Sequence, residues 1–215
     1  MSAHRIFLLS PANTGGKRAS LLFNERATFP LAIQLRTPEG APLGNAFSFL
    51  SGLYFRGKLA YARTFARPPR RVEGSLVITS SRGLVSPETH VTLDDLREFA
   101  TVPISVDEPR YTERLIADAT RVHRAAGPRT DVVLLGSIAS DKYVKLLGEI
   151  FGERLLFPAD FVGRGDMSRG GLMLRCVRES RELDYIAVAG ATRQGARPAR
   201  LAPIRARRSR PDPAP

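Results

Sequence analysis

Residues 10–18 read Ser-Pro-Ala-Asn-Thr-Gly-Gly-Lys-Arg and directly follow the short apolar run 5–9. The two glycines, the hydroxyls and the Lys-Arg pair could hold a phosphate group through backbone N–H groups and cationic side chains. The spacing is not that of a Walker A loop, and a plain turn between a strand and a helix is the competing interpretation. The candidate phosphate ligands in this segment are Asn13, Thr14, Lys17 and Arg18.

Residues 54–62 interleave aromatic and basic side chains around Gly57. An aromatic ring such as that of Tyr61 could stack on a base while Arg56 and Lys58 hold a phosphate. The alternative is an amphipathic helix that buries its aromatic face, and the apolar spacing over 43–66 favours it.

Two further polar segments come directly after predicted strands, where α/β proteins bind their ligands. Ser80, Ser81 and Arg82 follow the β-branched run 76–79, and Arg82 is a candidate anion ligand. Residues 136–143 follow the most apolar run, 131–136, and contribute Ser140, Lys142 and Tyr143 as binding candidates. Asp141 is the candidate catalytic acid or base. Helix capping by Ser140 or Asp141 is the simpler interpretation.

Residues 164–171 form a fifth segment, in which Arg164, Ser168 and Arg169 are candidate phosphate ligands beside two glycines. We find no Ser-His-Asp order, no HExxH motif, no paired carboxylates and no CxxC pattern in the chain. The single Cys176 and the three scattered histidines offer no metal-ligand spacing. The sequence therefore predicts no metal and no cofactor, and it leaves open whether the protein is an enzyme.

These segments must be positioned by alternating strands and helices, which predict an α/β fold with a mixed, largely parallel sheet and helices on both faces. The continuous apolar run 131–136 indicates a strand that is covered on both sides. The expected strands are 5–9, 29–35, 76–79, 131–136, 155–157 and 184–189. The expected helices are 17–23, one or two over 43–66, 93–100, 109–126, 141–150 and 167–180.

The charge balance points to a polyanionic partner. The chain has 33 Lys and Arg against 21 Asp and Glu, a net charge of +12, whereas its 43% hydrophobic content suits a globular core. A positive electrostatic field attracts nucleic acid, and we expect DNA rather than RNA. A genome biased toward arginine codons would give the same composition. No apolar run approaches membrane-spanning length, and the N-terminus is too weakly apolar for a signal peptide, so we expect a cytoplasmic protein without a membrane partner.

The chain divides into an α/β domain over 1–190 and a basic tail over 191–215. The tail has seven arginines and one aspartate, a net +6 that is half of the total charge. Its Pro, Ala and Arg content predicts disorder, and it could lie along phosphates or serve only as a solubilising extension.

Five segments in order resemble the YaaA family of peroxide-stress proteins. The family's Ser-Pro-Ala-Lys-Thr element resembles residues 10–14, and its Phe-Lys-Gly-x-x-Tyr element resembles residues 55–61, which have one extra residue before the Tyr. Its Leu-Ser-Gly-Leu-Tyr-Gly-x-Leu-x-Pro element resembles residues 79–87, and its Ala-Ser-Asp-Glu-Tyr element resembles residues 139–143. Its Lys-x-Ala-Arg-Gly-Leu-Met-Ser-Arg element resembles residues 164–169.

The resemblance implies a YaaA-like mixed α/β fold with a positively charged cleft, DNA binding and a role in limiting oxidative damage to DNA. Asn13 stands where the family has lysine, and the family's longer helical insert, which carries a helix-hairpin-helix-like element, is expected to be reduced or absent here.

Three hypotheses about function follow. The first is a nucleic-acid-binding protein of YaaA-like type, active in oxidative-stress protection or DNA maintenance through a basic cleft. The second is an enzyme that acts on a nucleotide, nucleoside or nucleobase in the same cleft. The third is a module that docks on the ribosome or another partner through the basic tail. The sequence leaves the oligomeric state open.

Overall fold

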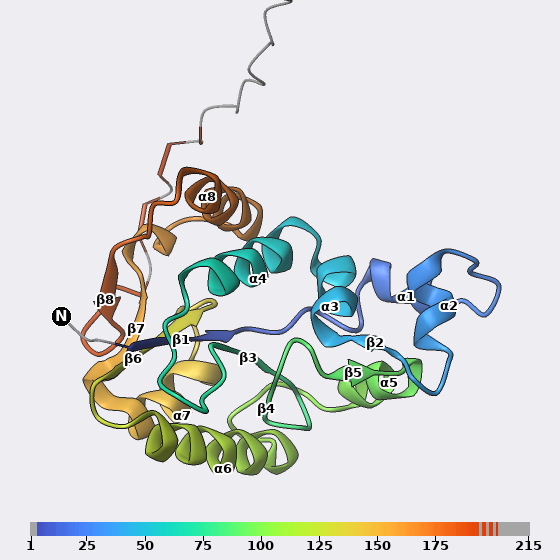
Figure 1. Cartoon of the computed structure of the whole chain (residues 1–215), viewed down its shortest axis with the longest axis horizontal. Helices are drawn as coiled ribbons and strands as arrows, with labels where there is room; N and C mark the ends of the chain where they lie inside the picture. Colours follow the sequence, from blue (N-terminus) through green and yellow to red (C-terminus); the bar gives the residue numbers. More distant parts are fainter. Residues whose placement is uncertain (1–3, 194, 197, 200, 202–215) are drawn as a thin grey trace, which may run out of the picture.

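A computed structural model describes residues 4–193, 195–196, 198–199 and 201 (Figure 1). The strands are β1 (His4–Leu9), β2 (Ala41–Pro42), β3 (Ser75–Ile78), β4 (Leu84–Val85), β5 (His90–Val91), β6 (Thr130–Leu135), β7 (Leu155–Pro158) and β8 (Tyr185–Ala187). The helices are α1 (Lys17–Phe23), α2 (Pro30–Leu35), α3 (Leu43–Ser51), α4 (Leu53–Phe65), α5 (Leu93–Thr101), α6 (Pro109–Ala126), α7 (Asp141–Phe151) and α8 (Asp166–Glu179). None of these helices is long and apolar enough to cross a membrane.

The main sheet has six strands in the order β4-β3-β1-β6-β7-β8, which confirms the predicted mixed, largely parallel sheet. β1 lies parallel to both β3 and β6, and β7 lies parallel to β6. The edge strands β4 and β8 are antiparallel to their neighbours. Because β1 runs between β3 and β6, the winding direction reverses at β1, and this is where doubly wound sheets bind ligands.

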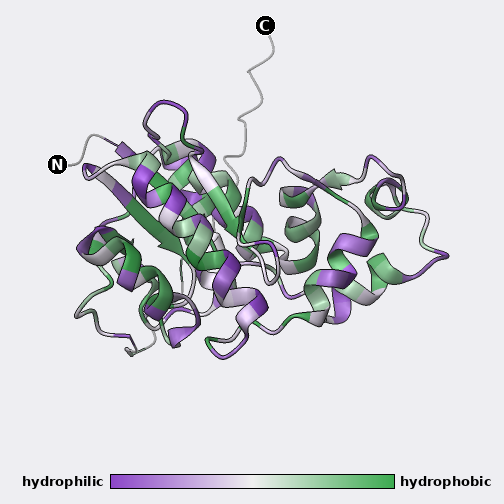
Figure 2. Ribbon diagram, turned by 90° about the horizontal axis from the view of Figure 1, so that it is seen from below, coloured by the Kyte–Doolittle hydropathy of each residue, from purple (hydrophilic) through white to green (hydrophobic). Residues whose placement is uncertain are grey.

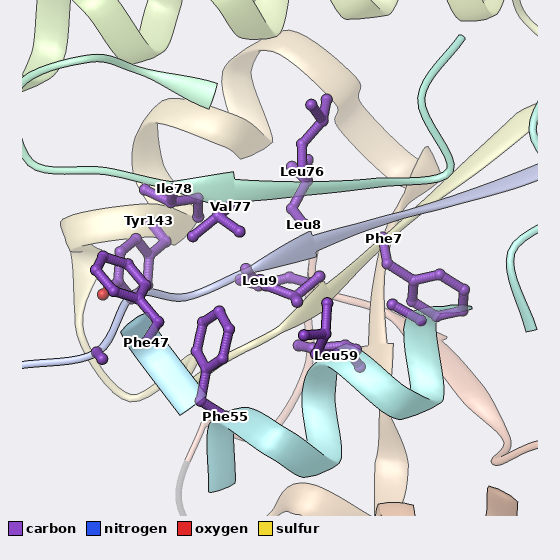
Figure 3. Close-up of a cluster of buried hydrophobic side chains, with 14 of the residues drawn as sticks. Phe7, Leu8, Leu9, Phe47, Phe55, Leu59, Leu76, Val77, Ile78 and Tyr143 are labelled. Atoms are coloured by element: carbon purple, nitrogen blue, oxygen red, sulfur yellow. The ribbon is translucent and has the colours of Figure 1, made fainter. Parts of the chain in front are cut away.

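Helices cover both faces of the sheet, as predicted: α4 and α8 lie on one side, and α6 and α7 on the other (Figure 1). Strongly hydrophobic residues colour the central strands in Figure 2, because these strands are buried on both faces. Figure 3 shows Phe55 and Leu59 of α4 on the same face of β1 as Leu9, while Leu8 lies on the opposite face beside Leu76 and Phe47 of α3 reaches the end of the strand. The remaining elements, α1, α2, α3, α5 and the β2–β5 ribbon, lie beyond the carboxyl edge of the sheet.

The expected strand over 29–35 is wrong, since this segment is helix α2. Pro30 occupies the first helical turn, where its missing N–H costs nothing, and the buried residues Ala32 and Leu35 are three apart, as on one face of a helix. The segment 43–66 forms two helices, separated at Gly52, whose φ of +58° favours glycine.

Gly57 and Gly170 allow α4 and α8 to pack closely. A Cβ atom on Gly57 would lie 2.7 Å from the carbonyl oxygen of Gly170, and one on Gly170 would lie 2.6 Å from the carbonyl oxygen of Leu53. Both glycines therefore serve helix packing rather than a close approach to a ligand.

The described part of the predicted tail lies against the domain. Leu201 packs on the core cluster, and a Cβ atom on Gly163 would collide with the backbone of Ala196. The basic stretch 202–215 lies outside the described residues, so the predicted disorder is untested there.

Candidate functional site

A pocket of about 410 Å³ lies at the carboxyl edge of the sheet, and we call it the strand-end pocket. Its walls come from the loop after β1, from Ser80 after β3, from α3, from α5 and the turn behind it, and from the first turn of α7. The lining residues are Pro11, Ala12, Asn13, Thr14, Gly15, Phe47, Ser80, Phe99, Ala100, Val102, Ile104, Lys142 and Tyr143. Four of the predicted binding residues, Asn13, Thr14, Lys142 and Tyr143, thus meet in one place.

The pocket combines one cation with polar groups and an apolar wall. Lys142 is its only charged lining residue among those described, and none of the lining residues is an aspartate or glutamate. Phe47, Phe99 and Tyr143 line it but are almost fully buried, and Ser80 donates a hydrogen bond to the carbonyl of Phe99. A cavity of this size and composition suits a drug-sized anion with a flat ring.

The loop after β1 is held in place by a buried lysine. Lys58 of α4 is fully buried, and its Nζ donates to the carbonyl oxygen of Ser10 and, over 2.9 Å, to the Ser10 hydroxyl. The Nζ also lies 4.4 Å from the ring centre of Tyr54 and 4.9 Å from that of Phe55. Lys58 therefore cannot meet a phosphate directly, and it acts on the pocket through Ser10.

Burial also shifts the pKa values around Lys58. The pKa of Lys58 is lowered to about 7, chiefly by desolvation, with Asp166 opposing the shift and Arg169 adding to it. Burial raises the pKa of Tyr54 to about 12, against the opposing effect of Arg169. The Tyr54 hydroxyl is buried without a hydrogen-bond partner among the described residues. Lys58 is thus poised to be neutral or charged close to pH 7.

Three predicted arginine ligands are occupied by protein groups instead. Arg82 pairs with Asp95 and Glu98 of α5, and this pairing holds the pKa of Glu98 below its usual range. Arg169 donates to the carbonyl of Phe161, and Arg164 donates to that of Asp160. Ser168 accepts a hydrogen bond from Arg164 over 3.4 Å. These side chains stabilise neighbouring segments and do not line the strand-end pocket.

Tyr61 and Asp141 do not fit their predicted roles. Tyr61 is fully buried, with its hydroxyl 2.6 Å from that of Tyr185, so it cannot stack on a ligand. Asp141 is exposed, pairs with Arg193 and does not line the pocket, so nothing in the geometry makes it an acid or base. Ser140 is exposed at the N-cap of α7 without a side-chain capping bond.

Two arginines from the predicted set line a second hollow, of about 670 Å³, which we call the side groove. Arg18 and Arg56 belong to it, and Lys17 is exposed next to Arg18. The side-groove residues are Arg18, Leu21, Ser48, Phe49, Ser51, Gly52, Leu53, Arg56 and Met167.

Sequence reasoning missed the α5 wall of the strand-end pocket. Phe99 and the residues behind it occur far from every polar motif in the chain, and only the apolar face of 93–101 indicated that this helix packs against something. No group of three or more His, Cys, Asp or Glu in the described part of the chain could hold a metal ion.

Comparisons with models of protein families, with curated proteins and with solved structures found no match for this chain. The resemblance to the YaaA family therefore stays a prediction, and the case for function rests on the geometry of the two hollows and on charge.

Proposed function

We propose that the protein binds nucleic acid, DNA in preference to RNA, by taking one nucleotide unit into the strand-end pocket. The observation that carries this proposal is the convergence of the segments after β1, β3 and β6 on one pocket that has a lysine and no carboxylate. Its apolar lining leaves room for a base, and Lys142, next to the Asp141 carboxylate that pairs with Arg193, would contact a phosphate. By its resemblance to the YaaA family, the protein would serve in oxidative-stress protection or DNA maintenance.

The net charge of +12 supports the polyanionic partner. Neutralised phosphates release counterions, so the affinity for DNA should fall steeply as salt rises. A free nucleotide offers the same base and phosphate, and the experiment must separate these two sources.

The test uses two lysines of the same helix. Lys142 lines the pocket, whereas Lys145 is exposed and lies outside it. Fluorescence anisotropy with labelled single-stranded DNA, single-stranded RNA and duplex DNA, and thermal shift with mononucleotides, would be measured for the wild type, Lys142→Gln and Lys145→Gln.

We expect Lys142→Gln to weaken DNA binding roughly tenfold, because one charge-assisted contact contributes about 1–3 kcal/mol. Lys145→Gln should stay near the wild type. Stabilisation by mononucleotides alone would make a free nucleotide the ligand. Equal effects of the two substitutions, or no binding of DNA at low salt, would refute the proposal.

The contact between Lys58 and Ser10 favours the second candidate, an enzyme that acts on a nucleotide in the same pocket. A neutral lysine 2.9 Å from a serine hydroxyl can accept its proton, as in serine–lysine pairs that form a nucleophile and base. Ser10 is buried, its hydroxyl donates to the carbonyl oxygen of Leu135 over 3.3 Å, and its neighbour Pro11 lines the pocket whereas Ser10 itself does not, so this role requires the loop after β1 to move. Nucleotides incubated with the wild type and with Ser10→Ala would be analysed by chromatography. Product from the wild type alone would establish the enzyme, and no product from either would exclude this candidate for the nucleotides tried.

A further inference from the structure

The side groove is an apolar surface that the protein leaves open. Met167 of α8 is 66% exposed and Leu21 of α1 is 53% exposed, although both are large hydrophobic residues. Phe49 of α3 and Leu53 of α4 also line the groove and are partly buried. Four helices therefore contribute apolar side chains to one hollow, and such a surface commonly marks a binding site.

The charged residues in the described lining of the groove are all basic. Arg18 and Arg56 line it and are exposed, and its described lining contains no aspartate or glutamate. Arg18 donates one N–H to the carbonyl oxygen of Phe49 over 3.1 Å, so its remaining N–H groups would make the contact with an anion. The carboxylate of Asp166, next in sequence to Met167, lies 3.7 Å from the guanidinium of Arg169. An anionic partner with flat or apolar groups complements this combination of arginines and hydrophobic surface.

The groove and the strand-end pocket lie on two sides of the same elements. Gly15 lines the pocket, and Arg18, at the start of the helix that follows it, lines the groove. On α3, Phe47 lines the pocket and Phe49 lines the groove. Lys17, exposed at the first residue of α1, lies between them in sequence. A sugar–phosphate chain that leaves the pocket past Lys17 would reach Arg18.

We propose that the side groove binds the nucleotides adjacent to the one in the strand-end pocket, so that the ligand is a single-stranded segment of nucleic acid. Unpaired bases can stack on or pack against the apolar floor while Arg18 and Arg56 contact the phosphates. In a duplex the bases are paired and stacked on one another, so no base would be available to contact the apolar residues of the groove. This inference rests on the proposed function of the pocket and extends it to a strand.

The test measures anisotropy of labelled oligothymidylates of increasing length and of a blunt duplex, at several salt concentrations. The variants are Arg56→Gln, at an exposed position, and the double variant Arg18→Gln/Arg56→Gln. The matched control is Arg70→Gln/Arg178→Gln. Arg70 and Arg178 are also exposed, in the loop before β3 and in the last turn of α8, away from both hollows. Thermal melts verify that each variant is folded.

We expect affinity to rise with length beyond a dinucleotide and to exceed that for the duplex. Each arginine substitution should make the negative slope of log K against log salt shallower by about 0.7, the value for one phosphate contact in a single strand. The double variant should lose more affinity for long oligonucleotides than for the dinucleotide, and the control variant should keep the wild-type salt slope.

A double variant that behaves like the control, or a duplex that binds as tightly as the single strand, would overturn the inference. If Lys142→Gln still weakened binding in that case, nucleotide binding in the pocket would be supported and only the proposal for the groove would be refuted. If neither Lys142→Gln nor the double variant mattered, both proposals would fail.

Discussion

Lys58 is the residue whose role changes most between sequence and structure. Its neighbours on α4 suggested a phosphate ligand, but it lies on the buried face and donates to Ser10. Tyr54, Lys58, Tyr61 and Phe65 follow the 3.6-residue period of one helical face, so its burial could have been inferred from spacing. Its contact with Ser10 could not, because the two residues are distant in sequence.

Replacing Lys58 with methionine should flatten the pH dependence of stability. The folded protein releases this proton near pH 7, whereas the unfolded chain keeps it until about pH 10.5, the ordinary value. The unfolded state therefore binds more protons between these limits, and the free energy of unfolding rises with pH, by up to about 1.4 kcal/mol per unit. Below pH 7 both the folded and the unfolded state hold the proton, so Lys58 no longer makes the free energy of unfolding depend on pH.

Urea unfolding at pH 6.5, 8 and 9.5 measures this difference between the wild type and Lys58→Met. Lys145→Met, at an exposed position on α7, is the control and should follow the wild type. Parallel curves for the wild type and Lys58→Met would show that Lys58 keeps its proton in the fold.

At the scale of elements, most helices were predictable from the sequence, whereas one short helix and the shortest strands were not. α1 and α6 begin and end at the predicted residues, and the capping box at Thr92 and Asp95 starts α5 as expected. The two-residue strands β2, β4 and β5 were missed, because pairing with distant segments defines them rather than local pattern. α2 was misassigned because a short apolar run fits either period.

The contact between α4 and α8 depends on two glycines, and adding a methyl group there should destabilise the fold. Gly57→Ala would bring a Cβ atom to 2.7 Å from the backbone of Gly170, so we expect a loss of about 1–3 kcal/mol. Gly148→Ala, within α7, would place its Cβ atom in open space with no neighbouring side chain within 4 Å, so it should instead stabilise by up to about 1 kcal/mol. Thermal or urea unfolding of both variants tests this, and equal effects would contradict the packing role.

At the scale of the whole molecule, the topology assembles the site. Residues 11–15, Ser80 and 142–143 are far apart in sequence, and the sheet order brings them to one edge. The sequence indicated that each segment follows a strand, which placed them at the same edge. It could not show that Arg82 would be neutralised by α5 or that Arg18 and Arg56 would face a separate groove, since these depend on helix packing.

The positive charge has two sources that truncation can separate. Deleting 202–215 removes four arginines and one aspartate. We expect weaker DNA binding at low salt and a smaller salt slope, because fewer counterions are released. Lys142→Gln should weaken binding by the same factor in the truncated and full chains, because the proposal gives the pocket a contact of its own and independent sites act additively. Anisotropy titrations of the four proteins would show this, and loss of the Lys142 effect after truncation would contradict it.

Amide chemical shifts during titration with a single-stranded oligothymidylate test the central claim most directly. If the strand-end pocket takes a nucleotide, the signals of Asn13, Thr14, Gly15, Lys142 and Tyr143 shift and saturate together, and in Lys142→Gln the signals of the other four residues need roughly tenfold more oligonucleotide to shift as far. If these signals stay in place while only those of 202–215 move, the pocket is not the binding site and the basic tail alone holds the DNA.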